Sequence, residues 1–220
     1  MFIVVQRHEY EKYSALLDQS FRLRKRVFFD RLGWDVSIDG DFERDAYDDL
    51  GPVYLLWCDD RAETLYGTVR LMPTTGPTLL FDVFGSTFPD AMLSAPGIWE
   101  GTRMCVDDAA IRRDFPDLSS ARAFSLLLLA LCECGLDHGI HTLVSNYEPH
   151  FRRIYQRAGL RVTELGRADG YGRFPVCCGV FDVSEETRQA MRRALNLTRP
   201  LYRSRRIIAH AENTPERLSA

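Results

Sequence analysis

Hydrophobic residues recur along the chain with two different spacings, and these spacings predict its helices and strands. Runs with a period of three to four residues predict helices over 13–33, 119–137 and 149–159, and Ser184 can cap a last helix. Short apolar or alternating runs predict strands at 2–5, 53–58, 65–72, 99–106, 140–147, 161–165 and 176–183. The mixed order of strands and helices predicts an α/β sandwich, with one central mixed β-sheet flanked by helices.

The length and hydropathy of the chain favour one large domain outside the membrane. A chain of 220 residues buries enough surface to fold without a disulfide framework. Its longest apolar run, 126–132, is too short to span a bilayer. The first ten residues, MFIVVQRHEY, lack the basic region and cleavage site of a signal peptide. We therefore expect a cytoplasmic protein whose six cysteines are reduced thiols.

Charge is distributed unevenly along the sequence. The formal net charge is −3, which argues against a nucleic-acid-binding protein. Ten carboxylates and two arginines lie between residues 35 and 63, whereas 192–206 holds six arginines and no acid. The acidic segment is suited to a cationic small molecule, and the basic end to phosphates or an acidic partner. Two solvated faces of opposite sign explain the same pattern.

Several common kinds of site have no motif in this chain. Its five histidines and six cysteines form no HExxH and no paired CxxC, so we expect no metal. No strand is followed by GxGxxG, and no P-loop is present, which argues against a nucleotide cofactor. The absence of GxSxG argues against a covalent serine mechanism.

Charged residues interrupt segments that otherwise have the pattern of a protein core. Arg24 lies on the apolar face of the first predicted helix, and the others lie in or beside strands: Asp45, Asp48, Arg70, Glu100 and Arg103. A buried charge costs several kcal/mol unless it is paired, and three arginines can balance three carboxylates. The cluster is therefore either a structural ion network or a polar pocket in which one carboxylate acts as a base.

The same charged positions lie within motifs that resemble one enzyme family. The segments LRKRVFFDRLGW, ERDAYDD, GTVRLMP, LLFDVF and WEGTRMCVD resemble, in order, those of the LuxI-type acyl-homoserine-lactone synthases. The family positions that they fill are Arg24, Phe28, Trp34, Asp45, Asp48, Arg70, Phe84, Glu100 and Arg103. The resemblance covers about residues 2–181 and implies a GNAT-like three-layer fold. It places an autoinducer synthase domain at 1–190 and a basic C-terminal extension at 191–220, either part of the same domain or partly disordered.

The resemblance also implies a reaction. The amine of S-adenosylmethionine, a substrate and not a cofactor, attacks an acyl thioester, and lactone closure then releases methylthioadenosine. Acyl-coenzyme A is the favoured donor, acyl carrier protein is the alternative, and we expect a short or branched acyl group. A general GNAT-like N-acyltransferase is disfavoured because the usual phosphate loop is missing after Val106. A non-catalytic sensor of acyl thioesters or S-adenosylmethionine is disfavoured because the Glu100 and Arg103 positions are filled.

Roles for individual residues follow from the resemblance and from chemical need. Glu100 is the expected general base, with Arg103 as a second catalytic residue, and backbone N–H groups near 104–106 could bind the oxyanion if the strand bulges there. Residues expected to bind S-adenosylmethionine are Arg24, Phe28, Trp34 (a possible lid), Asp45, Asp48, Phe84 and Arg103. Those expected to contact the acyl group are Arg70, Met104, Cys105, Val106, Thr142, Val144 and Tyr147. Carrier phosphates are assigned to Arg152, Arg153 and Arg157, whose guanidinium groups suit phosphate. Arg24 is expected to pair with Asp45 or Asp48.

Overall fold

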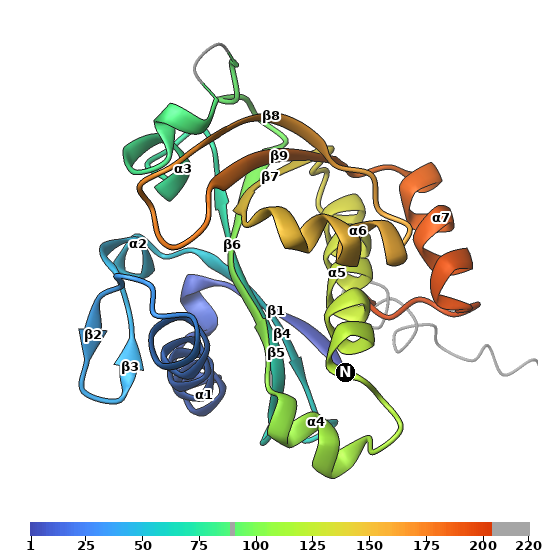
Figure 1. The fold of residues 1–220 in the computed structure, drawn as a ribbon. Coiled ribbons are helices and arrows are strands. Elements are labelled where there is room, and N and C mark those ends of the chain that lie inside the picture. Colours follow the sequence, from blue (N-terminus) through green and yellow to red (C-terminus); the bar gives the residue numbers. More distant parts are fainter. Residues whose placement is uncertain (89–90, 204–220) are drawn as a thin grey trace, which may run out of the picture.

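A seven-stranded mixed sheet forms the centre of the computed structural model, which describes residues 1–88 and 91–203 (Figure 1). The strands in spatial order are β1 (Phe2–Val5), β4 (Val53–Cys58), β5 (Leu65–Pro73), β6 (Ile98–Val106), β7 (Thr142–Tyr147), β9 (Val176–Asp182) and β8 (Thr163–Ala168). Neighbours are antiparallel except for β6 and β7, which are parallel. The seven strands predicted from the sequence are confirmed, with ends that differ by a few residues.

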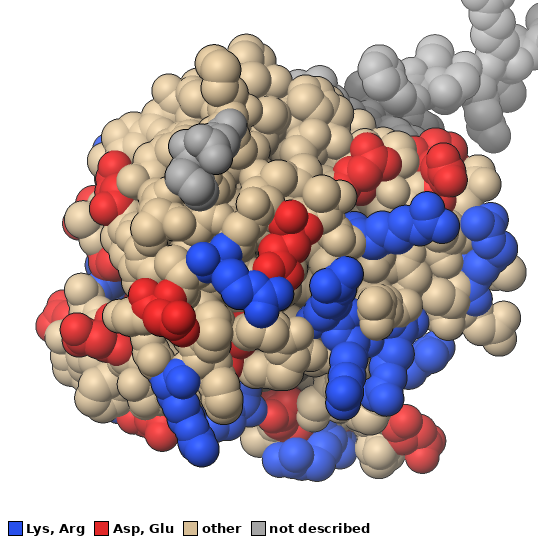
Figure 2. Space-filling model, turned by 45° about the horizontal axis from the view of Figure 1, so that its top comes forward, with Lys and Arg blue, Asp and Glu red and all other residues tan. Residues whose placement is uncertain are grey.

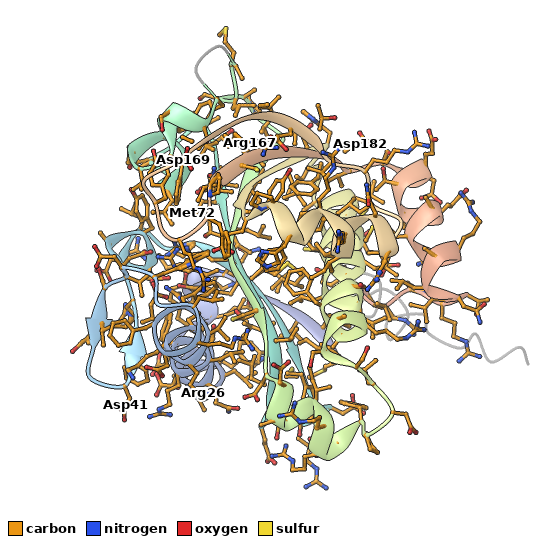
Figure 3. The ribbon with its side chains drawn as sticks, viewed as in Figure 1. Arg26, Asp41, Met72, Arg167, Asp169 and Asp182 are labelled. Carbon is orange, nitrogen blue, oxygen red and sulfur yellow. The ribbon has the colours of Figure 1, made fainter. Side chains whose placement is uncertain are left out.

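Helices cover both faces of this sheet and give three layers. Figure 1 shows α1 (Ser14–Arg24), α2 (Ala46–Asp49) and α3 (Leu79–Asp82) on one face, and α5 (Ser120–Asp137), α6 (Arg152–Arg157) and α7 (Glu185–Leu195) on the other. The short α4 (Asp108–Asp114) follows β6 directly. Side chains fill the space between the layers (Figure 3). The predicted sandwich with a central mixed sheet is therefore confirmed.

The core has its centre on α5. Ser119 caps this helix, because its hydroxyl accepts a hydrogen bond from the backbone N–H of Arg122 at 3.3 Å. Leu127, Leu129 and Ala130 are fully buried against the sheet. An apolar helix of this kind gains most of its stability from packing rather than from intrinsic propensity. A second cluster of buried side chains joins α1 to the opposite face of the sheet.

The sheet opens between β6 and β7. Their pairing runs from Ile98↔Thr142 to Glu100↔Val144, and the Ser145 hydroxyl then donates to the Gly101 carbonyl at 2.7 Å. The pairing of β5 with β6 shifts register in the same region, and Arg103 has a φ of +54°, which is rare for a residue with a Cβ. The bulge lies at Arg103 and Met104, opposite Val69, and so overlaps the start of the segment 104–106 where a bulge was expected. Beyond the pair Glu100↔Val144, strands β6 and β7 diverge and leave a gap in the sheet.

Several short elements were not predicted. The ribbon of β2 (Ile38–Asp39) and β3 (Phe42–Glu43), and helices α2, α3 and α4, are too short to show a period. The predicted first helix is α-helical only to Arg24 and continues as a π-helix over Lys25–Arg31. π-Helical segments are rare and are frequently found at functional sites.

The described part of the C-terminal segment packs on the domain. The proposed boundary at residue 190 falls inside α7, and Arg192 donates to buried Glu133 at 2.6 Å. The same carboxylate accepts the backbone N–H groups of Leu201 and Tyr202 at 2.7 and 2.9 Å. The part of the predicted extension beyond Arg203, which holds three of its arginines, lies outside the described residues. Within 1–88 and 91–203, no helix combines the length and the apolar character needed to cross a bilayer.

Candidate active site

Six charged side chains, four of them buried and two (Asp45 and Arg103) slightly exposed, form a closed ring on the face that carries α1 and α2. Arg24 pairs with Glu43 at 2.5 Å and with Asp48 at 2.8 Å. Arg70 pairs with Asp48 at 3.0 Å and with Asp45 at 2.5 Å. Arg103 closes the ring through Asp45 at 3.1 Å and Glu43 at 2.9 Å. Every arginine therefore bridges two acids and every acid bridges two arginines, so the charges sum to zero.

The ring joins elements that are far apart in the sequence. Arg24 ends α1, Glu43 lies in β3, and Asp45 caps α2 by accepting the backbone N–H of Tyr47 at 3.0 Å. Arg70 and Arg103 come from the neighbouring strands β5 and β6. The predicted pairing of Arg24 with Asp48 is confirmed. Glu43 was missed, although it precedes Asp45 by two residues and so lies on the same face of an extended segment.

Burial and pairing act in opposite directions on the protonation of the ring. Burial alone would lower the pKa of Arg24, but its bonds to Asp48 and Glu43 outweigh this effect and raise it. Burial alone would raise the pKa of Asp48, but Arg24 and Arg70 hold it below its usual range. The Tyr54 hydroxyl also donates to Asp48 at 2.6 Å. Arg24 and Asp48 therefore stay ionised at neutral pH.

Glu100 lies beside the ring but outside it. Its side chain is 1% exposed, and neither carboxylate oxygen has a hydrogen-bond partner among the described residues. Burial raises the pKa of Glu100 from its usual 4.5 to about 7, although the charge of Arg70 opposes the shift, as do the nearby backbone N–H groups of Leu80 and Leu79, which lie outside hydrogen-bond geometry. A carboxylate with a pKa near neutrality is suited to accept and return a proton.

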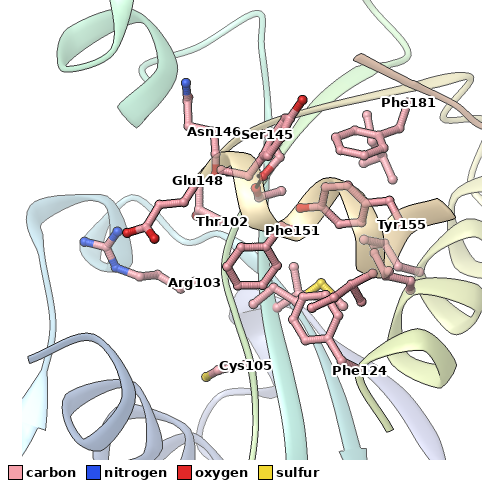
Figure 4. A pocket seen from close by; sticks show the side chains of 18 of the residues that line it. Thr102, Arg103, Cys105, Phe124, Ser145, Asn146, Glu148, Phe151, Tyr155 and Phe181 are labelled. Atoms are coloured by element: carbon pink, nitrogen blue, oxygen red, sulfur yellow. Dashed lines mark hydrogen bonds between the residues drawn. The ribbon is translucent and has the colours of Figure 1, made fainter. Parts of the chain in front are cut away.

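A cavity of about 450 Å³ passes through the gap between β6 and β7. On the α1 side its walls include Phe28, Trp34, Phe84 and Arg103. On the α5 side they are apolar and combine rings with aliphatic side chains such as Leu128 and Leu131, and Figure 4 shows the rings of Phe124, Phe151, Tyr155 and Phe181 opposite Arg103 and Glu148. The cavity therefore has a polar half beside the charged ring and an aromatic half inside the core.

Trp34 crosses the polar half of this cavity. Its ring stacks on Phe28 with centroids 5.1 Å apart, and its indole N–H donates to Glu148 at 3.2 Å. Glu148 follows β7 directly, so this bond joins the segment after the π-helix to the far side of the gap. The expected role of Trp34 as a lid stays a prediction.

The structure separates the other predicted contacts into two groups. The predicted acyl-contacting residues Met104, Cys105, Val106, Val144 and Tyr147 line the cavity. Arg70 and Thr142 do not line it, and neither does the predicted base Glu100, although its chain neighbour Gly101 does. The guanidinium of Arg70 is occupied by two aspartates and by Thr102 at 3.1 Å, and Thr142 lies where β6 and β7 are still paired. These two predicted acyl contacts are therefore not supported.

The three arginines assigned to carrier phosphates are exposed on α6. Arg152, Arg153 and Arg157 lie outside the cavity and point to solvent. In Figure 2, basic side chains gather on the side of the molecule that carries α6 and α7. Within the described residues, no group of three or more His, Cys, Asp and Glu side chains is arranged to hold a metal ion.

The sequence model of one family, the autoinducer synthases, matches residues 8–191. The chain belongs to this family. An acyl-homoserine-lactone synthase of Rhizobium etli is 36% identical over 205 residues, which cover 91% of this synthase and 92% of the relative. One from Agrobacterium fabrum is 37% identical over 172 residues, or 77% and 80% of the two chains. This synthase is therefore an acyltransferase of quorum-sensing signal synthesis, as the sequence motifs indicated.

Solved structures agree with this assignment. The CoA-dependent synthase BjaI, in a structure with SAM and isopentyl-CoA, superposes on the synthase with a TM-score of 0.79 at 27% identity, covering 93% of both chains. The synthase LasI gives a TM-score of 0.74 at 27% identity, covering 87% of this chain and 93% of its own. A putative N-acetyltransferase from Lactobacillus plantarum, 21% identical with a TM-score of 0.51, shares the fold. The GNAT-like fold predicted for the chain is confirmed.

Proposed function

We propose that this synthase joins an acyl group from acyl-coenzyme A to the α-amine of S-adenosylmethionine and then closes the homoserine lactone. The observation that carries the proposal is the cavity through the split sheet, with the unpartnered Glu100 at the point where β6 and β7 separate. Its polar half accommodates the amine substrate and its aromatic half the acyl group. The two reactants then meet in the gap.

The first step forms an amide. The amine nitrogen attacks the thioester carbonyl carbon, the carbon–sulfur bond breaks, and coenzyme A leaves as the thiolate. Glu100, directly or through a water molecule, accepts the proton that the amine must lose. On the side that faces the gap, β6 has no strand partner beyond Glu100. Its backbone N–H groups around the bulge at Arg103 are suited to stabilise the oxyanion.

The second step forms the lactone. The substrate carboxylate attacks its own γ-carbon, the bond from that carbon to the sulfonium sulfur breaks, and neutral methylthioadenosine leaves. Among the ring arginines, Arg103 is the one that lines the cavity, so we assign it to the carboxylate. Arg24, with a side chain 1% exposed, orders Glu43 and Asp48 instead. The sulfonium lies near the aromatic faces of Phe28, Trp34 and Phe84, where a cation is favoured.

The acids of the ring have a structural role in this scheme. Asp45 and Asp48 were candidates for binding the cationic substrate or the arginines, and their oxygens are occupied by arginines and by Tyr54. Asp45 holds Arg103 in position, Asp48 pairs with Arg24 and Arg70, and both acids contribute to the neutrality of the ring. A cationic substrate therefore approaches an aromatic wall next to a balanced charge network.

Coenzyme A is the proposed donor for two reasons. The exposed arginines of α6 offer several guanidinium groups to its phosphates, and BjaI, similar over 93% of the chain, is a CoA-dependent enzyme. The aromatic half of the cavity is walled by the rings of Phe124, Tyr155 and Phe181, which favours a short or branched acyl group over a long flexible chain.

The test supplies purified protein with S-adenosylmethionine and one acyl group, carried either on coenzyme A or on acyl carrier protein. We expect lactone and methylthioadenosine in equal amounts, with the higher kcat/KM for the coenzyme A thioester. A preference of a hundredfold or more for the carrier protein, about 2.8 kcal/mol, would reverse the donor assignment.

The same assay tests the base. Glu100→Gln preserves the shape of the side chain and removes the proton acceptor, so we expect kcat/KM to fall by about 10²–10⁴. Glu148→Gln is the control, because this carboxylate is also buried, it lines the cavity next to which Glu100 lies, and the amide of glutamine can still accept the Trp34 N–H. Wild-type activity in Glu100→Gln would remove Glu100 from the mechanism.

A further inference from the structure

The loop between β8 and β9, residues 169–175, brings an aromatic side chain to the polar half of the cavity. Asp169, at the start of this loop, lies on the α3 side of the molecule (Figure 3). Gly170, with a φ of +97°, allows the turn that precedes Tyr171. Tyr171 lines the cavity together with Phe84, and their ring centroids are 4.8 Å apart.

The hydroxyl of Tyr171 makes hydrogen bonds to one residue before and one residue after Phe84 in the sequence. It donates to the Val83 carbonyl at 3.0 Å and lies 2.6 Å from the Ser86 hydroxyl. Because the Tyr171 proton is used by Val83, Ser86 is the donor in the second bond. One phenol thus fixes the residues that precede and follow the half-buried Phe84, which sits between α3 and a short 3₁₀ turn, Gly85–Thr87.

The hairpin that carries this loop is itself anchored on the 3₁₀ turn. A Cβ at Gly166 of β8 would lie 2.6 Å from the Thr87 carbonyl oxygen, so only glycine lets the strand approach so closely. The Asn146 amide of β7 donates to the Thr87 hydroxyl at 3.1 Å. The loop therefore starts from a fixed base, and Tyr171 is held against Phe84 by the fold.

We infer that Tyr171 is a positioning residue for the nucleoside end of the amine substrate. This inference rests on the proposed function. Two pairs of rings form flat aromatic walls in this half of the cavity: Phe28 stacks on Trp34, and Phe84 packs against Tyr171. Such walls are suited to a flat heteroaromatic base. Tyr171 acts by holding Phe84 at that wall and takes no part in proton or acyl transfer.

The test measures the dissociation constant of methylthioadenosine, a ligand that carries the nucleoside without the amine or the carboxylate, by calorimetry. Tyr171→Phe keeps the ring and loses both hydrogen bonds, whereas Tyr171→Ala loses ring and bonds. We expect the dissociation constant to rise about tenfold in Tyr171→Ala and by a smaller factor in Tyr171→Phe. Phe174→Ala is the control, because Phe174 belongs to the same loop, is 47% exposed and does not line the cavity.

Steady-state kinetics separate this role from a general loss of structure. The KM for S-adenosylmethionine should rise in parallel with the dissociation constant, while the KM for the acyl donor stays at the wild-type value. Wild-type methylthioadenosine affinity in Tyr171→Ala, or an equal loss for both substrates, would overturn the inference. A wild-type protein that binds methylthioadenosine and makes no lactone would instead overturn the proposed function, and the affinity comparison would still decide the role of Tyr171.

Discussion

Replacing Glu100 with glutamine should stabilise the fold while it lowers kcat/KM. The carboxylate is buried, its oxygens have no hydrogen-bond partner among the described residues, and burial raises its pKa from 4.5 to about 7. Between these two values the folded protein holds a proton that the unfolded chain has lost. Stability therefore falls as pH rises through this range, and the full cost is present above pH 7.

The size of this effect follows from the shift. The two pKa values differ by about 2.5, and each unit corresponds to about 1.36 kcal/mol, so the charged form costs on the order of 3 kcal/mol. Glu100→Gln removes that cost without changing the volume of the side chain. For a chain of this size, roughly 2–4 °C per kcal/mol gives a melting temperature higher by about 6–12 °C at pH 8.

The assay is thermal or urea unfolding of the wild type and Glu100→Gln between pH 4.5 and 8. We expect the two proteins to converge at the acid end and to separate progressively above it. Glu148→Gln should show no such separation, since it removes a carboxylate that already has a hydrogen-bond partner. A Glu100→Gln variant that is less stable than the wild type at pH 8, or a difference that does not change with pH, would refute the reasoning.

Other substitutions test the charged ring, the entrance and the C-terminal segment. Arg24→Ala leaves buried acids uncompensated, and urea unfolding should show a free energy of unfolding lower by about 3–5 kcal/mol. Arg31→Ala is the control, because it loses only an exposed ion pair and should lower the free energy of unfolding by less than about 1 kcal/mol. Trp34→Phe keeps the aromatic face and loses the bond to Glu148, so the KM for S-adenosylmethionine should rise several-fold with kcat little changed; an unchanged KM would remove this bond from substrate binding. Glu133→Ala should destabilise the fold by about 2–4 kcal/mol without altering KM, and a change in KM would contradict its purely structural role.

The strands and long helices could be predicted from the sequence because each has a clear hydrophobic period. The apolar run 53–58 and the dense helix that begins after Ser119 are examples in which pattern and structure agree. The ribbon Ile38–Asp39 with Phe42–Glu43 could not be found in this way, since two residues per strand contain no period. The change from α- to π-helix at Lys25 also leaves no mark in the spacing of apolar residues.

The sequence predicted most residues of the site, but not which of them pair with one another. The motifs gave Arg24, Asp45, Asp48, Arg70 and Arg103 as a charged cluster, but the sequence was interpreted with Glu100 as the third acid. The structure puts Glu43 in that place and leaves Glu100 without a partner. Which acid faces which arginine depends on how distant strands align, and no local pattern contains that information.

The closed ring of alternating charges restricts how this protein can change over time. Each of the six groups neutralises two others, so removing one leaves two buried charges partly unsatisfied. No single replacement of an arginine by a neutral residue keeps the total at zero. Loss of a charge at these positions therefore requires an acid and a base to be replaced together, through intermediates that are less stable, and a ring of this kind has few short mutational routes to an uncharged core.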